Sequence, residues 1–450
     1  MWDSSITIML IVFIFTIIFM LWRPFGINET IPTTIGAVIV LITGIVSWND
    51  VLGILGIVSG PSLTILSTIM MSIVLESIGF FRWIAYNIVI KSKESGVRLY
   101  IYIILLCFLM TMLFNNDGSI LITTPIIIHI VKLLRFKPHQ ALAYLISGAL
   151  IATAASAPIA VSNISNLIAL EIVGLSLNSY VEMVFVPSMI GIFTITFLLY
   201  FYFKRSIPKR TKSIPINVNT NEQLLYSHPL DIRTDYVEID WKMFKVCLII
   251  VVATRASFFA LSPIGIPIEF IGLLGAAILI AVRWLRMKTG LSDIIKNSPW
   301  YIFLFAFNMY VLVYGLKNVG LNDIIIKTFK TSVEHDILNA AMIMGLLSTF
   351  LSNIFNNLPT VMIGTLSIME MGLDPLFLQV AYLANVIGSD IGALLTPIGT
   401  LATLIWMFIL KRHGILITWG NYLKVTILVI PIGLIVSLIS LYLWVTLIFE

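Results

Sequence analysis

Two Asn-rich turns interrupt apolar segments of this 450-residue chain, and each turn offers several hydrogen-bond donors and acceptors. The first turn is Asn115-Asn116-Asp117-Gly118, and the second is Asn356-Asn357-Leu358-Pro359-Thr360. Side-chain amides both donate and accept hydrogen bonds, and Asn and Gly tolerate the backbone conformations of turns. A turn within a membrane survives only where it is buried in protein or lines an aqueous space. We therefore expect these turns to form part of a polar site for a small solute.

A second pair of polar interruptions lies in two long apolar runs, 141–170 and 376–410. Ser156-Ala157-Pro158 breaks the first run and is followed by Ser162, Asn163 and Asn166. Asp390-Ile391-Gly392 and Thr396-Pro397-Ile398-Gly399-Thr400 break the second run. Helix ends at such breaks carry partial charges, so we expect the turns and breaks to converge near the membrane midplane. The predicted solute-binding residues are Asn116, Asp117, Ser162, Asn163, Asn356, Asn357, Thr396, Gly399 and Thr400.

Asp117 and Asp390 are the two carboxylic acids beside these interruptions. An ionisable residue within a membrane segment is a functional candidate by default, and burial favours the protonated form of a carboxyl group. Both are therefore predicted to couple transport to protons, with helix capping as the alternative role. Arg255 and Glu269 are predicted to form a structural ion pair between consecutive spans.

Composition places the chain in a membrane. It is 59% hydrophobic and only 11% charged, whereas a soluble domain carries about 25% charged residues. At roughly 20 residues per span, ten to twelve passages fit, and the run 6–22 is interpreted as a retained first span rather than a signal peptide. Neither the two cysteines nor the histidines have the spacing of a metal site. The chain also lacks a phosphate-binding loop, so it does not hydrolyse ATP by that mechanism.

The polar interruptions also recur at a nearly constant offset. Phe114-Asn115-Asn116 is repeated as Phe355-Asn356-Asn357, and Gly79 matches Gly320, both 241 residues apart. An internal repeat containing interrupted apolar segments is typical of secondary transporters.

The predicted fold is an all-α integral membrane protein with two inverted repeats. Each repeat contains five transmembrane helices and one re-entrant hairpin, with broken helices at the midplane. The first repeat covers 1–203, with its hairpin at 98–133 and its broken helix at 141–170. A cytoplasmic linker covers 204–241, and the second repeat covers 242–450, with its hairpin at 336–372 and its broken helix at 376–410.

The distribution of basic residues predicts the orientation of these spans. With this topology, 23 of the 27 Lys and Arg residues fall on one side, Arg23 among them. Basic loops are retained in the cytoplasm. The first hairpin therefore opens to the cytoplasm, the second opens to the outside, and both termini lie outside.

The same motifs resemble the bacterial arsenite permease family, the membrane component of arsenical pumps, within the ion-transporter superfamily. The resemblance covers essentially the whole chain. It is carried by Asn116-Asp117-Gly118, Asn356-Asn357 with Pro359-Thr360-Val361, Ala384-Asn385-Val386-Ile387-Gly388-Ser389-Asp390 and Thr396-Pro397-Ile398-Gly399. The chain departs from the family pattern at Thr153, where an acid is usual, and at Ala393-Leu394, where Pro-Lys is usual.

This resemblance implies an efflux permease in the bacterial plasma membrane. The expected substrate is arsenite or antimonite, exported as the neutral trihydroxide in exchange for protons. Some family members associate with a soluble ATPase at the cytoplasmic face. No cofactor, metal or nucleic acid is implied. The alternative is a permease of the same fold for another small solute or a carboxylate, although citrate-type relatives usually have Ser-Asn-Thr at the hairpin tips.

Overall fold

The computed structural model describes residues 4–24, 27–211, 240–288 and 290–449, and all regular elements within these ranges are helices. Most of the predicted linker, 212–239, lies outside the described residues. The first half contains α1 (Ser4–Trp22), α2 (Thr30–Ile42), α3 (Trp48–Ser77), α4 (Phe80–Lys91), α5 (Gly96–Leu113), α6 (Asn116–Leu133), α7 (Pro138–Ala154), η2 (Ala160–Ser162), α8 (Ile164–Val173) and α9 (Leu177–Phe203). The second half contains α11 (Trp241–Leu261), η3 (Ser262–Ile264), α12 (Ile268–Met287), α13 (Ser292–Asn297), α14 (Tyr301–Asn318), α15 (Leu321–Val333), α16 (Ile337–Phe355), α17 (Asn357–Glu370), α18 (Pro375–Asp390), η4 (Gly392–Leu395), α19 (Leu401–Arg412) and α20 (Trp419–Ile448).

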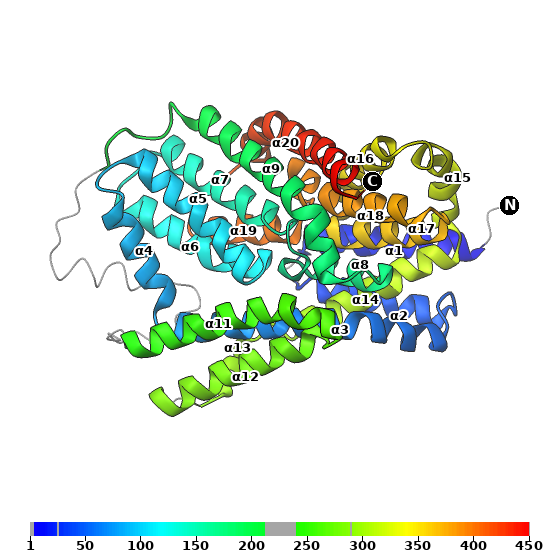
Figure 1. The fold of residues 1–450 in the computed structure, drawn as a ribbon, viewed down its shortest axis with the longest axis horizontal. Helices are drawn as coiled ribbons and strands as arrows, with labels where there is room; N and C mark the ends of the chain where they lie inside the picture. Colours follow the sequence, from blue (N-terminus) through cyan, green and yellow to red (C-terminus); the bar gives the residue numbers. More distant parts are fainter. Residues whose placement is uncertain (1–3, 25–26, 212–239, 289, 450) are drawn as a thin grey trace.

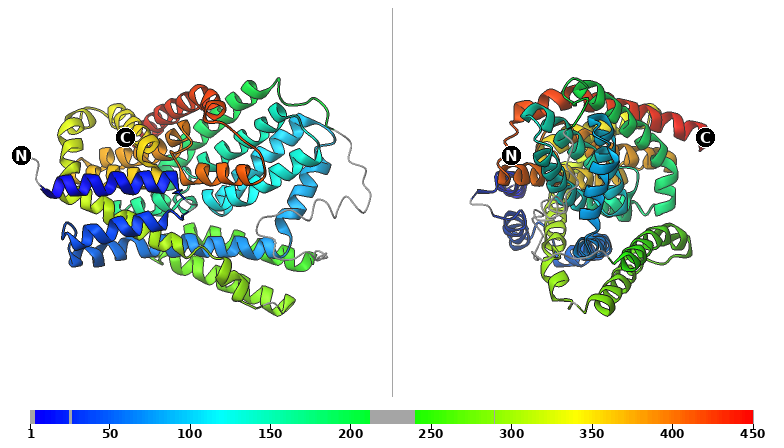
Figure 2. Two further views of the ribbon diagram at one scale, coloured as in Figure 1. Left: turned by 180° about the vertical axis from the view of Figure 1, so that it is seen from behind. Right: turned by 90° about the vertical axis from the view of Figure 1, so that its left-hand side faces the viewer.

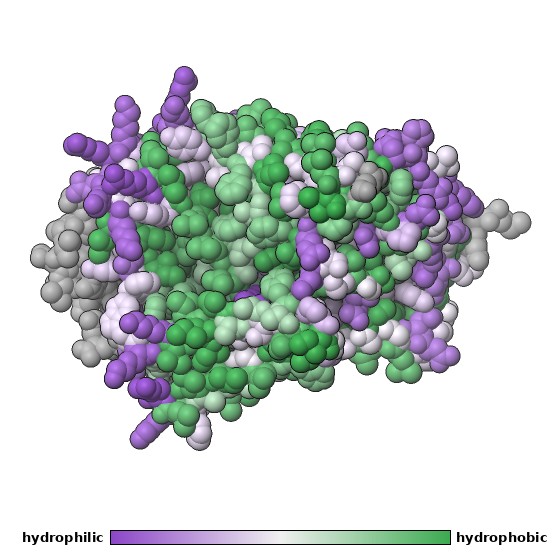
Figure 3. All heavy atoms as spheres, in the orientation of Figure 1, coloured by the Kyte–Doolittle hydropathy of each residue, from purple (hydrophilic) through white to green (hydrophobic). Residues whose placement is uncertain are grey.

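The prediction of a multi-pass helical membrane protein, which rests on composition, is confirmed. Ten candidate spans among the described residues are long and apolar enough to cross a membrane. These ten include the hairpin legs α5 and α16 but not α2, whose 13 residues extend only about 20 Å. On the face shown in Figure 3, a mainly hydrophobic band covers the middle of the molecule and separates two hydrophilic ends. The bilayer therefore surrounds this band, with the long axis of the molecule crossing it.

The order of elements along the chain occurs twice. In each half, three apolar segments precede a shorter helix, a helical hairpin, a broken helix and a long final helix. The shorter helices α4 and α15 both begin after a glycine with positive φ, which is 78° at Gly79 and 85° at Gly320. A residue with a side chain rarely adopts this conformation, so the matching glycines turn the chain in the same way before each hairpin.

The two halves exchange packing partners instead of forming separate bodies. Helix α2 packs on α14, and the corresponding α12 packs on α3. The hairpin leg α6 packs on α19, and the corresponding leg α17 packs on α8. The long helices α9 and α20 lie side by side (Figure 1). Each hairpin is therefore supported by the broken helix of the other half.

Helix α1 begins at one end of the molecule and α20 finishes in the same half, whereas the end of α9 and the start of α11 lie at the opposite end (Figure 1). Basic residues gather at this second end, where α4, α6, α9 and α12 finish and α5 and α7 begin. They include Lys91, Arg98, Lys132, Lys137, Lys204 and Arg286. The grouping of Arg23 with these residues is wrong, because α1 ends near the middle of the long axis (Figure 2).

Candidate functional site

The tip of the first hairpin is held by the side chains of its own asparagines. Asn115 is extended, with φ −161°, and its Oδ1 accepts a hydrogen bond from the Gly118 amide at 2.6 Å. Its Nδ2 donates to Oγ1 of Thr68 on α3 at 3.3 Å. Asn116 is buried, and its Oδ1 accepts from the Asp117 amide at 2.8 Å. These contacts start α6 and fix the position of Asp117.

Arg255 of α11 also binds this tip. Its Nε donates to the Leu113 carbonyl at 2.5 Å, and its Nη2 donates to the Phe114 carbonyl. The predicted Arg255–Glu269 ion pair is therefore wrong, and Glu269 lies instead close to Gly60 of α3. The C-terminal carbonyls of a helix are free and carry partial negative charge. Because α5 ends inside the protein, the guanidinium satisfies these carbonyls and compensates their charge.

The tip of the second hairpin is joined to the break in the second broken helix. Asn356 has a φ of 85°, which Asn tolerates better than most residues. Its Nδ2 donates to the Ile398 carbonyl at 3.1 Å, and the Asn357 amide donates to the Gly399 carbonyl at 2.9 Å. A Cβ at position 399 would overlap the Ala393 carbonyl, so this close approach requires glycine.

Asn353 fixes the same break from the preceding turn of α16. Its Nδ2 donates to the Gly392 carbonyl at 2.9 Å, and its Oδ1 accepts from the Thr396 amide at 2.7 Å. After the break, the Thr400 hydroxyl accepts from the Thr403 amide at 3.1 Å and caps the start of α19. The backbone groups freed by this interruption are thus partly satisfied by side chains.

Asp390 connects the two broken helices. Its Oδ2 accepts from Ser156 Oγ at 2.8 Å and from Asn166 Nδ2 at 2.7 Å, and its Oδ1 accepts from Asn163 Nδ2 at 2.8 Å. Asn163 is also the N-cap of α8, so the carboxylate lies at the start of that helix. A helix N-terminus favours a negative charge. Asp390 is therefore bound by three donors and by the dipole of a helix from the other half.

Asp117 has a different environment. Its side chain is half-buried, and its carboxylate accepts no hydrogen bond from any described residue. It lies within electrostatic range of both Glu29 and Asp390. This carboxyl group is free to exchange a proton or to contact a solute without first breaking a hydrogen bond inside the protein.

Several buried polar atoms around the breaks also make no hydrogen bond to the described residues. They are Ser162 Oγ, Asn166 Oδ1, Thr360 Oγ1 and Thr396 Oγ1. The three hydroxyls can donate or accept, and the amide oxygen can accept. Buried polar groups in proteins normally have a partner, so each of these atoms has the capacity to form a hydrogen bond to a solute.

The structure brings some of the predicted site residues into direct contact and leaves others apart. Asn163 bonds Asp390 and Asn357 bonds Gly399. No hydrogen bond among the described residues joins the tip of the first hairpin to the tip of the second. The predicted residues therefore form two groups, one around Asp390 and one around Gly399, with Asp117 beside the first.

Two tyrosines that sequence reasoning missed anchor the breaks in a matching way. Tyr180 of α9 donates to the Ala157 carbonyl at 2.6 Å, and Tyr422 of α20 donates to the Leu394 carbonyl at 3.0 Å. The tyrosines are 242 residues apart, close to the offset of the hairpin motifs. This offset in the sequence is the signal that identifies them.

Thr153 is the position in the first broken helix where the family usually has an acid. Its hydroxyl donates to the Ala149 carbonyl at 3.1 Å.

A family model, two relatives and one solved structure each match most of this chain. A family model described as arsenical pump membrane protein matches residues 8–445. A Bacillus subtilis (strain 168) protein whose name places it with the arsenical pump membrane proteins is 46% identical over 443 residues, which cover 98% of this chain and 100% of the relative. The arsenical pump membrane protein of Escherichia coli is 33% identical over 430 residues, covering 96% and 97%. The crystal structure of the Alcanivorax borkumensis YdaH transporter, described as having an unusual topology, has a similar fold. Its TM-score is 0.57 at 9% identity, and the match covers 88% of this chain and 87% of that one.

Proposed function

Because this chain belongs to the arsenical pump membrane protein family, we propose that it exports arsenite or antimonite as the neutral trihydroxide in exchange for protons. The observation that carries this proposal is the set of buried hydroxyl and amide oxygens in or beside the two broken helices that have no hydrogen-bond partner among the described residues. A trihydroxide donates and accepts several hydrogen bonds at once, so it suits such a site. Thiolate binding is disfavoured, since Cys107 and Cys247 lie on α5 and α11 and not at the breaks.

Proton exchange is supported by the difference between the two carboxyl groups of the site. A carboxyl group that couples transport to protons must change its charge during the cycle. Asp117 has no hydrogen-bond partner among the described residues, whereas Asp390 has three. We therefore assign proton exchange to Asp117 and the linking of the two halves to Asp390.

The transport test uses everted membrane vesicles, in which efflux appears as uptake. Arsenite and antimonite should accumulate when respiration acidifies the interior, and a protonophore should abolish the accumulation. Vesicles without the protein control for passive entry. Accumulation of a carboxylate such as citrate, with none of arsenite, would instead establish the alternative of a permease for another solute.

The proposed transport mechanism also requires a defined topology. Two inverted repeats, 1–203 and 242–450, would expose the site alternately to the two sides of the plasma membrane. The end where basic residues gather would face the cytoplasm, where a soluble ATPase could bind, and both termini would lie outside. The exchanged packing of the halves supports this arrangement.

Thiol labelling tests this topology on intact cells. Single cysteines replace Ser4, Asn219 or Glu450 in a background without Cys107 and Cys247. An impermeant reagent should label positions 4 and 450 only. Labelling at position 219 would contradict the inverted-repeat arrangement.

A further inference from the structure

The chain that leaves α9 turns back onto the start of α5, at the end of the molecule where basic residues gather (Figure 1). The Thr211 amide donates to the Glu94 carbonyl at 2.7 Å. A Cβ at Gly96 would overlap the Pro208 carbonyl, so the two parts of the chain lie in direct contact. The segment 204–211 is therefore held against the start of α5.

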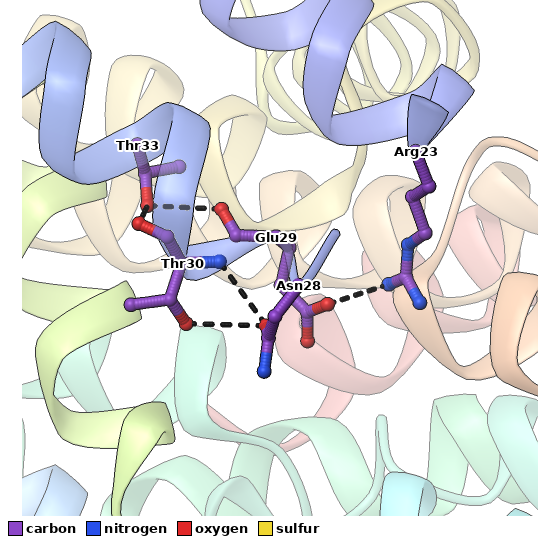
Figure 4. A network of polar contacts seen from close by, with 5 residues as sticks. All are labelled: Arg23, Asn28, Glu29, Thr30 and Thr33. Atoms are coloured by element: carbon purple, nitrogen blue, oxygen red, sulfur yellow. Dashed lines mark hydrogen bonds and ion pairs between the residues drawn. The ribbon is translucent and has the colours of Figure 1, made fainter. Parts of the chain in front are cut away.

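This contact brings basic side chains from both parts of the chain to one surface. We call the following exposed residues the α5–α9 cation cluster: Lys93, Arg98, Lys204, Arg205, Lys209 and Arg210. Glu94 is the single acidic residue in the segments 91–98 and 204–211. No member of the cluster forms an ion pair among the described residues, whereas Arg23 lies 2.9 Å from Glu29 in the turn between α1 and α2 (Figure 4). A concentration of one sign of charge attracts counter-ions, so the cluster favours an anion.

The cluster adjoins apolar surface that belongs to a membrane span. Helices α5 and α9 are both candidate spans, and the ring centroids of Tyr100 and Tyr200 lie 6.1 Å apart where α5 starts and α9 ends. Nζ of Lys204 lies over the Phe201 ring, 5.6 Å from its centroid. Phe197 packs on Phe201 with ring centroids 4.4 Å apart, and the two side chains are 61% and 52% exposed. Cations therefore lie directly beside aromatic side chains that face lipid.

We propose that the α5–α9 cation cluster binds the phosphate headgroup of an anionic phospholipid, whose acyl chains lie along Phe197 and Phe201. Lysine and arginine at a membrane surface attract anionic lipids, and guanidinium groups form paired hydrogen bonds with phosphate oxygens. An acidic soluble protein or free phosphate would use the cations but not the exposed aromatic rings beside them. A phospholipid uses both, so the combination favours a lipid. This inference does not depend on which solute is transported.

Thermal unfolding of the purified full-length protein in detergent measures this binding. A lipid that binds the folded state raises the midpoint of unfolding in a concentration-dependent way. Dioleoylphosphatidylglycerol, which is anionic, should raise the midpoint, and zwitterionic dioleoylphosphatidylcholine should not. The rise should shrink at high salt, which screens exposed charges. Equal rises with the two lipids would overturn the proposal, because the charge of the headgroup would then play no part.

Two quadruple variants separate this site from the general positive charge of the same end. The first neutralises four cations of the cluster: Lys204→Gln, Arg205→Gln, Lys209→Gln and Arg210→Gln. The second neutralises four exposed cations outside the cluster, at the start of α11 and the end of α19: Lys242→Gln, Lys245→Gln, Lys411→Gln and Arg412→Gln. All eight side chains are exposed, so both variants should unfold at the wild-type midpoint without added lipid.

The first variant should need at least about tenfold more dioleoylphosphatidylglycerol for half of the full rise in midpoint, since each surface cation contributes to the attraction. The second should stay near the wild-type value. Native mass spectrometry of protein purified from membranes gives an independent count of retained anionic lipids, which should fall in the first variant only. Equal losses in the two variants, or no loss in the first, would refute a specific site.

Two further measurements test the contribution of the acyl chains. Glycerol 3-phosphate, a soluble headgroup analogue, should not raise the midpoint at concentrations at which the lipid saturates. The double variant Phe197→Ala and Phe201→Ala should weaken lipid binding, whereas Phe270→Ala on α12, where the side chain is 62% exposed, is the matched control. Stabilisation by glycerol 3-phosphate equal to that by the lipid would make the cluster a phosphate site and overturn the assignment to a membrane lipid.

Discussion

Asp117 and Asp390 are both intramembrane carboxylic acids beside an interrupted helix, yet their surroundings differ in kind. Asp390 is buried at the end of α18 and accepts hydrogen bonds from Ser156, Asn163 and Asn166 of the other half. Asp117 is half-buried at the start of α6, and its carboxylate accepts none from the described residues. Residue type and depth alone do not determine what a carboxyl group does in a membrane protein.

The number of hydrogen-bond donors around each carboxyl group affects the free energy of changing its charge. Three donors favour the negative charge of a carboxylate, and protonation of one of its oxygens weakens or breaks the hydrogen bonds that this oxygen accepts. A carboxylate without internal partners can gain or lose a proton with little rearrangement of its neighbours. Asp390 is thus suited to holding the halves together, and Asp117 is suited to a role that requires a change of charge.

The largest effect on stability is expected for Asp390→Asn. The substitution places an amide N–H₂ group among three donors, so at least one hydrogen bond is lost and a donor is left without a partner. We expect the free energy of unfolding to fall by about 3 kcal/mol. Thermal unfolding in detergent measures this, with Asp117→Asn as the matched control. Equal stability of the two variants would remove the distinction between the carboxyl groups.

A smaller effect is expected for Arg255→Gln, which tests how the tip carrying Asp117 is held. The shorter neutral side chain cannot satisfy the carbonyls of both Leu113 and Phe114, and we expect a loss of about 2 kcal/mol. Glu269→Gln is the control, since Glu269 is not the partner of Arg255. A larger loss in the control than in Arg255→Gln would restore the ion pair as the main interaction.

The smallest effect is expected for Ser156→Ala, which removes one of the three donors to Asp390 and keeps its charge. Two donors and the start of α8 remain, so the loss should be about 1–2 kcal/mol. Thermal unfolding of Ser156→Ala and Asp390→Asn under the same conditions compares the loss of one donor with the loss of the carboxylate itself. A loss as large as that of Asp390→Asn would mean that the three donors do not act separately.

Much of the architecture could be predicted from the sequence. A low charge content indicates a membrane protein, and Asn, Pro and Gly within apolar runs mark where helices end. The structure has helix ends at Asn115, Asn356, Ala155 and Ile391 within these runs. These signals are local, because they follow from the conformational preferences of single residues and their neighbours.

The partners of the charged residues could not be predicted in the same way. Asp390 and Ser156 are 234 residues apart, and Arg255 and Leu113 are 142 apart. Both contacts depend on how the halves exchange packing partners, which no local pattern specifies. The position of Arg23 is not predictable from a local pattern either. A basic residue after an apolar run normally marks the membrane surface, whereas Arg23 pairs with Glu29 in the turn between α1 and α2.

The most direct test of the division of roles is proton-driven transport by Asp117→Asn in everted vesicles. Uptake of arsenite is compared with and without an acidic interior, alongside exchange of labelled for unlabelled arsenite with no gradient. The account predicts that proton-driven accumulation collapses while exchange partly survives in a folded protein. Proton-driven accumulation at the wild-type level would contradict it and reduce Asp117 to a residue of the hairpin turn.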